Sequence, residues 1–337
     1  MTGGGLLGLA VGATNELTTS LRQAAGAAAG ELGYAVRLVR SAADEVGLDA
    51  VLAVGPPEFY DGRSDISVAV RRIAWFGEPL PSDRSHDELG NGSAVEHRLS
   101  GRAIRLLDGP ARRLKRLPLP RHLEDVRAAA FIDHECASNL AAALRRARTV
   151  DLVVVTSHDR ARVLAGHGVG ARVVPFGYHQ ALAGPIVTAV DRRDIAAVAF
   201  GSGLSWSSRR ARGLRACAER LAASRLVVAP ETWGPDRDAL LRRSRILLNV
   251  HRVPGNFIGL RVILAAAAGA VLVTEPMDDP SPFRPGMHYV EAPLELLAEA
   301  AERLLADEPR RRRIVEAGQA LLTGPLSMAS SLRSVLT

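Results

Sequence analysis

The sequence predicts an α/β protein made of two doubly wound domains that face each other across a cleft. The chain has 337 residues, more than one hydrophobic core usually organises. Short apolar runs alternate with helical patterns, which is typical of parallel sheets covered by helices on both faces. The alternation breaks near 177–193 and then restarts. We therefore expect domains at 1–184 and 185–323, with the segment 324–337 crossing back to the first domain.

The apolar runs place the strands, and the three- and four-residue periodicities place the helices. Strands are expected at 6–11, 34–39, 50–54, 72–76, 152–156, 172–175, 195–200, 226–229, 246–250, 270–274 and 288–290. Helices are expected at 16–32, 122–147, 207–222, 236–243, 257–268, 294–306 and 309–322. Residues 79–120 are rich in Pro and Gly and predict an irregular insert. Because ligands bind beyond the carboxyl ends of such strands, the loops that follow strands are the first places to look for a site.

The amino-acid composition limits the kinds of functional site that the chain could contain. Hydrophobic residues make up 47%, aromatic residues 4% and charged residues 23%, which fits a soluble globular chain. Of the 43 basic residues that give a net charge of +7, only Lys115 is a lysine. No P-loop motif is present, and Schiff-base chemistry is disfavoured, so any cation at a functional site should be an arginine. The two cysteines predict core residues. The lack of a signal peptide or a membrane span predicts a cytoplasmic protein.

Several catalytic motifs are missing. A dinucleotide fingerprint fails after the first strand and again at the glycine-rich turn 201–206, where a tryptophan replaces the third glycine. That turn contains Gly201, Ser202 and Gly203 and leads to Arg209 and Arg210, so it is either a phosphate-binding turn or an ordinary strand-to-helix connection. No Gly-x-Ser-x-Gly elbow occurs. His134 lies between two acids in a predicted helix and is either a general base or part of a solvated face.

Residues 245–275 carry the strongest signal. A buried strand ends in Asn249, His251 and Arg252, a Pro-Gly loop follows, and an alanine-rich helix containing Arg261 leads to a strand that ends in Thr-Glu. Polar residues gathered at a strand's carboxyl end predict a ligand there.

These residues resemble the C-terminal donor-binding domain of GT-B glycosyltransferases of group 1, especially the CgeB-like proteins. The likeness rests on Leu-Asn-x-His-Arg at 248–252, the arginine and small-residue helix at 261–269, and Thr-Glu at 274–275. It extends to Phe-Arg-Pro-Gly at 283–286, and more loosely to Trp-Phe-Gly-Glu-Pro at 75–79, Thr-Ser-His-Asp at 156–159 and Pro-Phe-Gly-Tyr at 175–178. The resemblance implies a GT-B fold and sugar transfer from a nucleotide diphosphate donor, with no metal and no cofactor.

Two positions depart from the family pattern. The glutamate that resembles the ribose-binding carboxylate of the family is replaced by Leu264, and the acid expected eight positions earlier is Asn256. Either Glu275 or another polar group contacts the ribose, or the nucleotide lies differently, or transfer activity is lost. We favour altered donor contacts.

The resemblance and the strand ends together give a set of expected site residues. Arginine suits the diphosphate because its planar fork binds phosphate oxygens bidentately, so Arg252 and Arg261 are the first candidates. The donor side comprises Gly201, Ser202, Gly203, Arg209, Arg210, Asn249, His251, Arg252, Asn256, Phe257, Arg261 and Glu275. The acceptor side comprises Gly12, Trp75, Glu78 and Thr156, and Glu78 or His134 is the expected base if the enzyme inverts.

Three rival functions remain at this stage. An epimerase or hydrolase of the same fold would need additional carboxylates in the cleft. A non-catalytic nucleotide- or sugar-binding protein would explain the two departures at Asn256 and Leu264. Nucleic-acid binding through the arginines is disfavoured because interleaved aromatic residues are lacking. The expected partners are a nucleotide sugar and a small-molecule or glycan acceptor, and a homodimer is left open.

Overall fold

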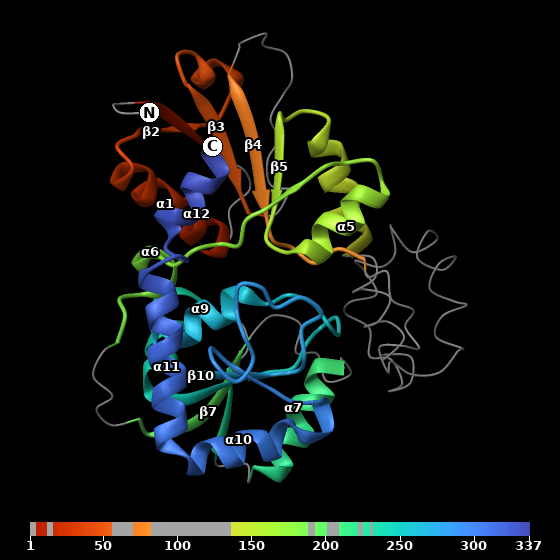
Figure 1. The fold of residues 1–337 in the computed structure, drawn as a ribbon, viewed down its shortest axis with the longest axis vertical. Coiled ribbons are helices and arrows are strands. Elements are labelled where there is room, and N and C mark those ends of the chain that lie inside the picture. The colour runs from red at the N-terminus through yellow and green to blue at the C-terminus, as the bar shows by residue number, and fades with distance from the viewer. Residues whose placement is uncertain are drawn as a thin grey trace, which may run out of the picture.

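The computed structural model describes residues 5–11, 16–55, 70–81, 136–187, 193–200, 209–221, 225–229 and 232–337. Within these ranges the chain forms two lobes, each built around a parallel sheet (Figure 1). The predicted boundary at 184/185 falls between helix α6 (Gln180–Ala183) of the first lobe and strand β7 (Ile195–Phe200) of the second.

The first sheet has the strand order β2-β1-β3-β4-β5-β6, and every pairing is parallel. Its strands are β1 (Leu6–Ala10), β2 (Ala35–Val39), β3 (Ala50–Val54), β4 (Arg71–Phe76), β5 (Leu152–Val155) and β6 (Arg172–Val173). The central strands consist mostly of buried apolar residues, as expected for a sheet covered on both faces. Because the strands are parallel, the loops after β3, β4 and β5 emerge at the same edge of the sheet.

Helices α1 (Glu16–Glu31) and α12 (Met328–Leu336) pack together on the first sheet. The alanines of α1 allow close packing, since Ala24, Ala25, Ala28 and Ala29 are buried in one core with Met328. The C-terminus therefore lies in the upper lobe beside the helix that follows the first strand (Figure 1). The described helices of this lobe also include residues 136–147, α5 (His158–Gly166) and α6 (Gln180–Ala183), and η1 (Ala42–Glu45) adds a 3₁₀ turn.

The second sheet has the order β11-β10-β9-β7-β8 and is also parallel throughout. Its strands are β7 (Ile195–Phe200), β8 (Leu226–Ala229), β9 (Ser244–Asn249), β10 (Val271–Thr274) and β11 (Val290–Glu291). The order reverses beside β7, which is the kind of switch point where ligands bind in open α/β sheets.

Helices cover both faces of the second sheet. They are α7 (Arg209–Arg220), α8 (Gly234–Arg243), α9 (Gly259–Ala267), α10 (Leu297–Ala306) and α11 (Glu308–Thr323), with the 3₁₀ turn η4 (Leu294–Leu296) before α10. Helix α9 is apolar enough to be buried between β10 and α11. Helix α11 then leads upward to α12, so that the chain returns to the first lobe (Figure 1). Within the part of the chain that is described, no helix is long and apolar enough to cross a membrane.

Three described helices were not expected from the sequence: α5, α6 and α12. Helix α5 has a clear start signal, because Ser157 is extended and its hydroxyl accepts a hydrogen bond from the backbone N–H of Arg160. The predicted insert lies mostly outside the described residues.

Candidate functional site

Arg209 at the start of α7 forms an ion pair with Glu275, which follows β10. The Nη1 atom of Arg209 donates to Oε2 of Glu275 at 2.9 Å and to the carbonyl of His251 at 3.0 Å, and Nη2 donates to Oε1. Side-chain exposure is 17% for Arg209 and 7% for Glu275. Burial would raise the pKa of Glu275, but the hydrogen bonds and charge of Arg209 outweigh it and hold that pKa below its usual range. The pair is therefore charged and balanced.

His251 is held in one orientation by a chain of hydrogen bonds. Arg210 donates to Oδ1 of Asn249 at 3.3 Å, which fixes the amide so that Nδ2 donates to Oγ1 of Thr274 at 2.9 Å. The Thr274 hydroxyl lies 3.0 Å from Nε2 of His251. Because its oxygen already accepts from Asn249, we assign the hydroxyl proton to the contact with Nε2. The backbone N–H of His251 donates to Glu275 at 2.7 Å. We assign the remaining ring proton to Nδ1 of His251.

The electrostatics of His251 agree with a neutral ring. Burial, together with three nearby arginines, lowers its pKa to about 4, although Glu275 opposes the shift. The Nδ1 atom is buried and has no hydrogen-bond partner among the described residues. Buried N–H groups are seldom left unpaired, so Nδ1 of His251 is a candidate hydrogen-bond donor for a ligand.

Three arginines form a cationic cluster beside β7, namely Arg210, Arg252 and Arg261. Arg210 and Arg261 both donate to the carbonyl oxygen of Phe200, at 2.7 Å and 3.0 Å. Burial and the charge of Arg252 lower the pKa of Arg210 to about 10. Burial and the charges of Arg210, Arg252 and Arg237 lower the pKa of Arg261. Each therefore feels a neighbouring positive charge, an arrangement that an anion would relieve.

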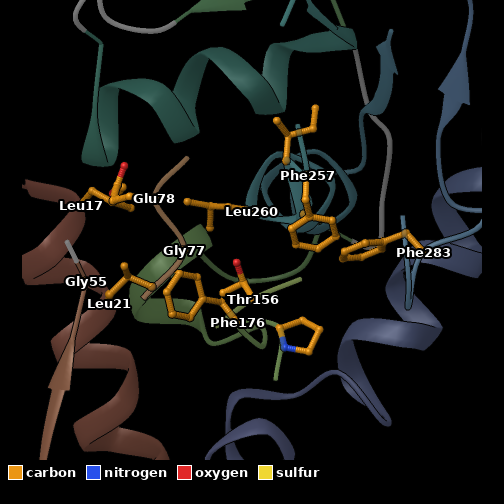
Figure 2. A pocket seen from close by; sticks show the side chains of 13 residues that line it. Leu17, Leu21, Gly55, Gly77, Glu78, Thr156, Phe176, Phe257, Leu260 and Phe283 are labelled. Carbon is orange, nitrogen blue, oxygen red and sulfur yellow. The ribbon is translucent and has the colours of Figure 1, made fainter. Parts of the chain in front are cut away.

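A cavity of about 140 Å³ lies between the two domains. It is lined by Leu17, Leu21, Gly55, Gly77, Glu78, Thr156, Pro175, Phe176, Phe257, Ile258, Gly259, Leu260 and Phe283. Figure 2 shows the leucines of α1 on one side, the phenylalanines of the second domain on the other, and Thr156 with Phe176 between them. The cavity lies where loops after β3, β4 and β5 meet the start of α9.

Arg160 of α5 joins the two domains beside this cavity. Its guanidinium donates to Ser157 at 2.9 Å and to the carbonyl of Glu78 at 2.8 Å in the first domain. It also donates to Oδ1 of Asn256 at 3.3 Å and lies over the ring of Phe257 in the second. Burial lowers the pKa of Arg160 to about 10, and the nearby charge of Glu78 opposes that shift.

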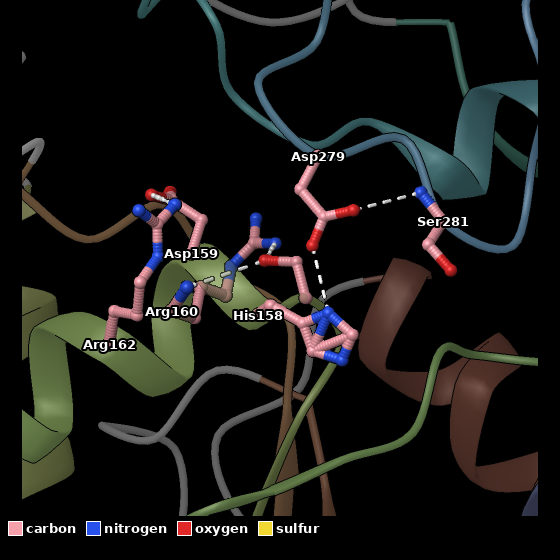
Figure 3. A network of polar contacts seen from close by, with 7 residues as sticks. His158, Asp159, Arg160, Arg162, Asp279 and Ser281 are labelled. Carbon is pink, nitrogen blue, oxygen red and sulfur yellow. Dashed lines mark hydrogen bonds and ion pairs between the residues drawn. The ribbon is translucent and has the colours of Figure 1, made fainter.

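A second contact between the domains lies at the surface. Nδ1 of His158 is 2.9 Å from Oδ2 of Asp279, and the other oxygen of Asp279 accepts the backbone N–H of Ser281 at 3.2 Å (Figure 3). The His158 side chain is 60% exposed, so the pair contributes little by itself. Together with Arg160 it fixes where α5 meets the second domain.

The expected donor residues fall into different environments. Arg210, Asn249, Arg252 and Arg261 gather at the carboxyl ends of β7 and β9, with His251 beside them. Arg209 and Glu275 neutralise each other, so neither is an isolated charge. Asn256 is bonded to Arg160, and Phe257 lines the cavity.

The expected acceptor residues divide in the same way. Glu78 and Thr156 line the cavity. The side chain of Trp75 does not: it is fully buried, its indole N–H donates to the carbonyl of Val174 at 2.8 Å, and its ring packs on Phe176. The side chain of Trp75 therefore belongs to the core and not to the acceptor side, because it lies on the buried part of the central strand β4. Gly12, His134, Gly201, Ser202 and Gly203 lie outside the described residues.

Sequence reasoning missed Arg160 and Thr274 as parts of the site. Thr274 could have been found as the last residue of the strand beside Asn249. Arg160 carries no comparable signal, because an arginine in the first turn of a helix usually faces water.

Leu264, one of the two departures from the family pattern, lies in a hydrophobic core. Its side chain is 5% exposed and belongs to a cluster with Phe200 and Leu247.

No group of three or more His, Cys, Asp or Glu side chains within the described ranges is arranged to hold a metal ion.

Comparison with known proteins agrees with this architecture. Residues 186–332 match the family model described as glycosyl transferase-like. No curated protein sequence matches the chain.

Solved structures extend the likeness to the whole chain. A glycosyltransferase from Rickettsia africae ESF-5 aligns with a TM-score of 0.57 and 10% identity, covering 98% of this chain and 97% of that one. HepE from Anabaena in complex with UDP gives 0.52 and 14%, covering 98% of each. An alpha-glucosyltransferase in complex with UDP gives 0.58 and 9%, covering 99% and 98%. The chain therefore has the two-domain GT-B fold of these structures, and its second domain is similar to the glycosyl transferase-like family.

Proposed function

We propose that this protein is a glycosyltransferase, which moves a sugar from a nucleotide diphosphate donor to an acceptor bound between the domains, without a bound metal ion. The observation that carries the proposal is the cluster of Arg210, Arg252 and Arg261. Arg210 is buried, Arg261 shares the carbonyl of Phe200 with it, and the charge of Arg252 acts on both. A diphosphate would compensate the positive charge that these arginines bring together. UDP is the first nucleotide to test, because HepE and the alpha-glucosyltransferase are in complex with UDP.

The arginines would act mainly on the leaving group. As the bond between the sugar C1 and the phosphate oxygen breaks, its electron pair stays on the diphosphate, and fixed positive charge stabilises that product. Preoriented arginines supply this stabilisation without reorganisation. The Nδ1–H of His251 adds a neutral hydrogen-bond donor for a phosphate or nucleoside oxygen, and the chain through Thr274 holds its tautomer.

On the other side of C1, an acceptor hydroxyl forms the new bond. Glu78 is the described carboxylate that lines the cavity, and it takes the acceptor proton if the configuration at C1 inverts. If the configuration is retained, the departing diphosphate takes that proton. The anomer of the product, read by NMR, separates the two courses.

A second candidate is a protein that binds nucleotide sugars without transferring them. It is favoured by Leu264, which lies in the core where the family has an acid, and by Asn256, whose amide oxygen is bound to Arg160. We rank it below transfer because the cavity and the cationic cluster are both present.

Binding of nucleoside diphosphates tests the proposal. We expect UDP, GDP, TDP or ADP to raise the melting temperature of the full chain, with at least one of them binding more tightly than its nucleoside, because the cluster contacts phosphate. A lack of any shift would refute the transferase proposal. Release of free sugar or product from the matching donor would then exclude the non-catalytic candidate.

A further inference from the structure

Polar and apolar residues are unequally distributed in the interdomain cavity. The first domain contributes the side chains of Leu17, Leu21 and Phe176 to its wall, and the second contributes Phe257 and Phe283. The polar side chains among its lining residues are those of Glu78 and Thr156. Among the described residues, a ligand in this space would thus meet mostly apolar side chains and few that form hydrogen bonds.

This lining is unsuited to a sugar acceptor. A sugar ring carries several hydroxyl groups, and each one that is buried without a hydrogen-bond partner weakens binding. Glu78 and Thr156 can together serve only a small number of them. A single hydroxyl group could donate a hydrogen bond to Glu78. Burial of the apolar remainder of the molecule away from water would then favour binding.

The size of the cavity sets a further limit. Its volume is about 140 Å³, and an apolar cavity of roughly 150 Å³ is large enough to hold benzene. Aromatic lining also suits a ring, because Phe257 and Phe283 are stacked with centroids 6.2 Å apart. The space thus fits one six-membered apolar ring.

We propose that the acceptor is an apolar ring that carries a hydroxyl group, such as a phenol, bound against Leu17, Leu21 and Phe176 with its hydroxyl at Glu78. This inference rests on the proposed transfer function, because it places the acceptor in the same cleft. The acceptor oxygen forms the bond to C1, and the diphosphate departs with the electrons of the broken bond between C1 and the phosphate oxygen. The hydroxyl proton passes to the Glu78 carboxylate if the configuration inverts, or to the departing diphosphate if it is retained.

Two probe molecules test directly whether the acceptor is an apolar ring with a hydroxyl group or a sugar. Phenol and methyl α-D-glucopyranoside are titrated separately into the full chain and followed by ligand-observed NMR, with and without UDP. We expect saturable binding of phenol and much weaker binding of the glucoside. Equal or stronger binding of the glucoside would overturn the proposal.

A variant then locates the binding. Leu17→Gln replaces a half-buried leucine of the cavity wall with a residue that α1 tolerates, and should weaken phenol binding about fivefold. Leu305→Gln, a half-buried leucine packed on the other domain's core, is the matched control and should leave it unchanged. If Leu17→Gln does not fold, Leu260→Gln on the opposite wall replaces it. Wild-type phenol affinity in a folded cavity variant would contradict the assignment.

UDP binding, measured on the same samples, separates the two proposals. If UDP binds and phenol does not, the acceptor class is wrong and the transferase proposal stands. If phenol binds and no nucleoside diphosphate does, the cavity is an apolar site and the transferase proposal fails.

Discussion

Arg209 and Arg261 both reach the carboxyl ends of strands in the second sheet, but their charges are compensated differently. Arg209 faces Glu275 and forms a bidentate pair. Arg261 shares the carbonyl of Phe200 with Arg210, and the charges that act on it are those of other arginines. The balanced pair is thus a structural element of the empty protein. The cationic cluster, by contrast, is where we propose that the diphosphate of the donor binds.

Among the variants that test this difference between Arg209 and Arg261, Glu275→Gln is expected to have the largest effect on stability. It leaves the charge of Arg209 uncompensated and weakens the acceptor for the His251 N–H, so we expect a loss of about 3 kcal/mol in the free energy of unfolding. Urea denaturation measures that loss. The affinity for a nucleoside diphosphate should not fall, because the variant removes no cation.

Glu299→Gln is the matched control, because Glu299 forms an exposed pair with Arg303 and its loss should change stability by less than about 0.5 kcal/mol. A Glu275→Gln protein that keeps its stability but loses nucleotide affinity would mean that Glu275 contacts the ribose, and the contrast would be wrong.

The pH dependence of stability tests the neutral state of His251. Its pKa is lowered to about 4 in the fold and returns to about 6.5 on unfolding. The unfolded chain therefore takes up a proton that the folded chain refuses, so this contribution is complete above pH 6.5 and is lost as the pH falls toward 4.

At pH 4.5 the loss should reach about 2 kcal/mol relative to pH 7. The His251→Gln variant lacks this titrating group, so its free energy of unfolding should fall less steeply between pH 7 and pH 4.5. This difference in slope is expected whatever the stability of the variant at pH 7. Parallel curves for the two proteins would show that His251 titrates normally and would contradict its lowered pKa.

Much of the architecture follows from sequence periodicity. Buried parallel strands read as continuous apolar runs, and the predicted strand at 246–250 corresponds to β9, with a shift of one or two residues at its ends. The gathering of Asn249, His251 and Arg261 could also be expected, since strand ends in a parallel sheet share an edge.

The remaining features depend on contacts between residues far apart in the chain. The sequence contains Arg209 and Glu275 but does not indicate that they pair, because 66 residues separate them. Trp75 looks like a cleft residue until the packing of Phe176 places it in the core. The role of Arg160 in joining the domains is visible only in the folded protein, where its side chain donates a hydrogen bond to Asn256 of the other domain.

The central claim is that the three-arginine cluster binds the diphosphate, and calorimetric titration of the best nucleoside diphosphate into Arg261→Ala tests it most directly. Loss of one charge-assisted contact should weaken binding about 10- to 100-fold. Arg303→Ala, which removes an exposed arginine of the same domain, should bind as the wild type does. A folded Arg261→Ala protein with wild-type affinity would contradict the account.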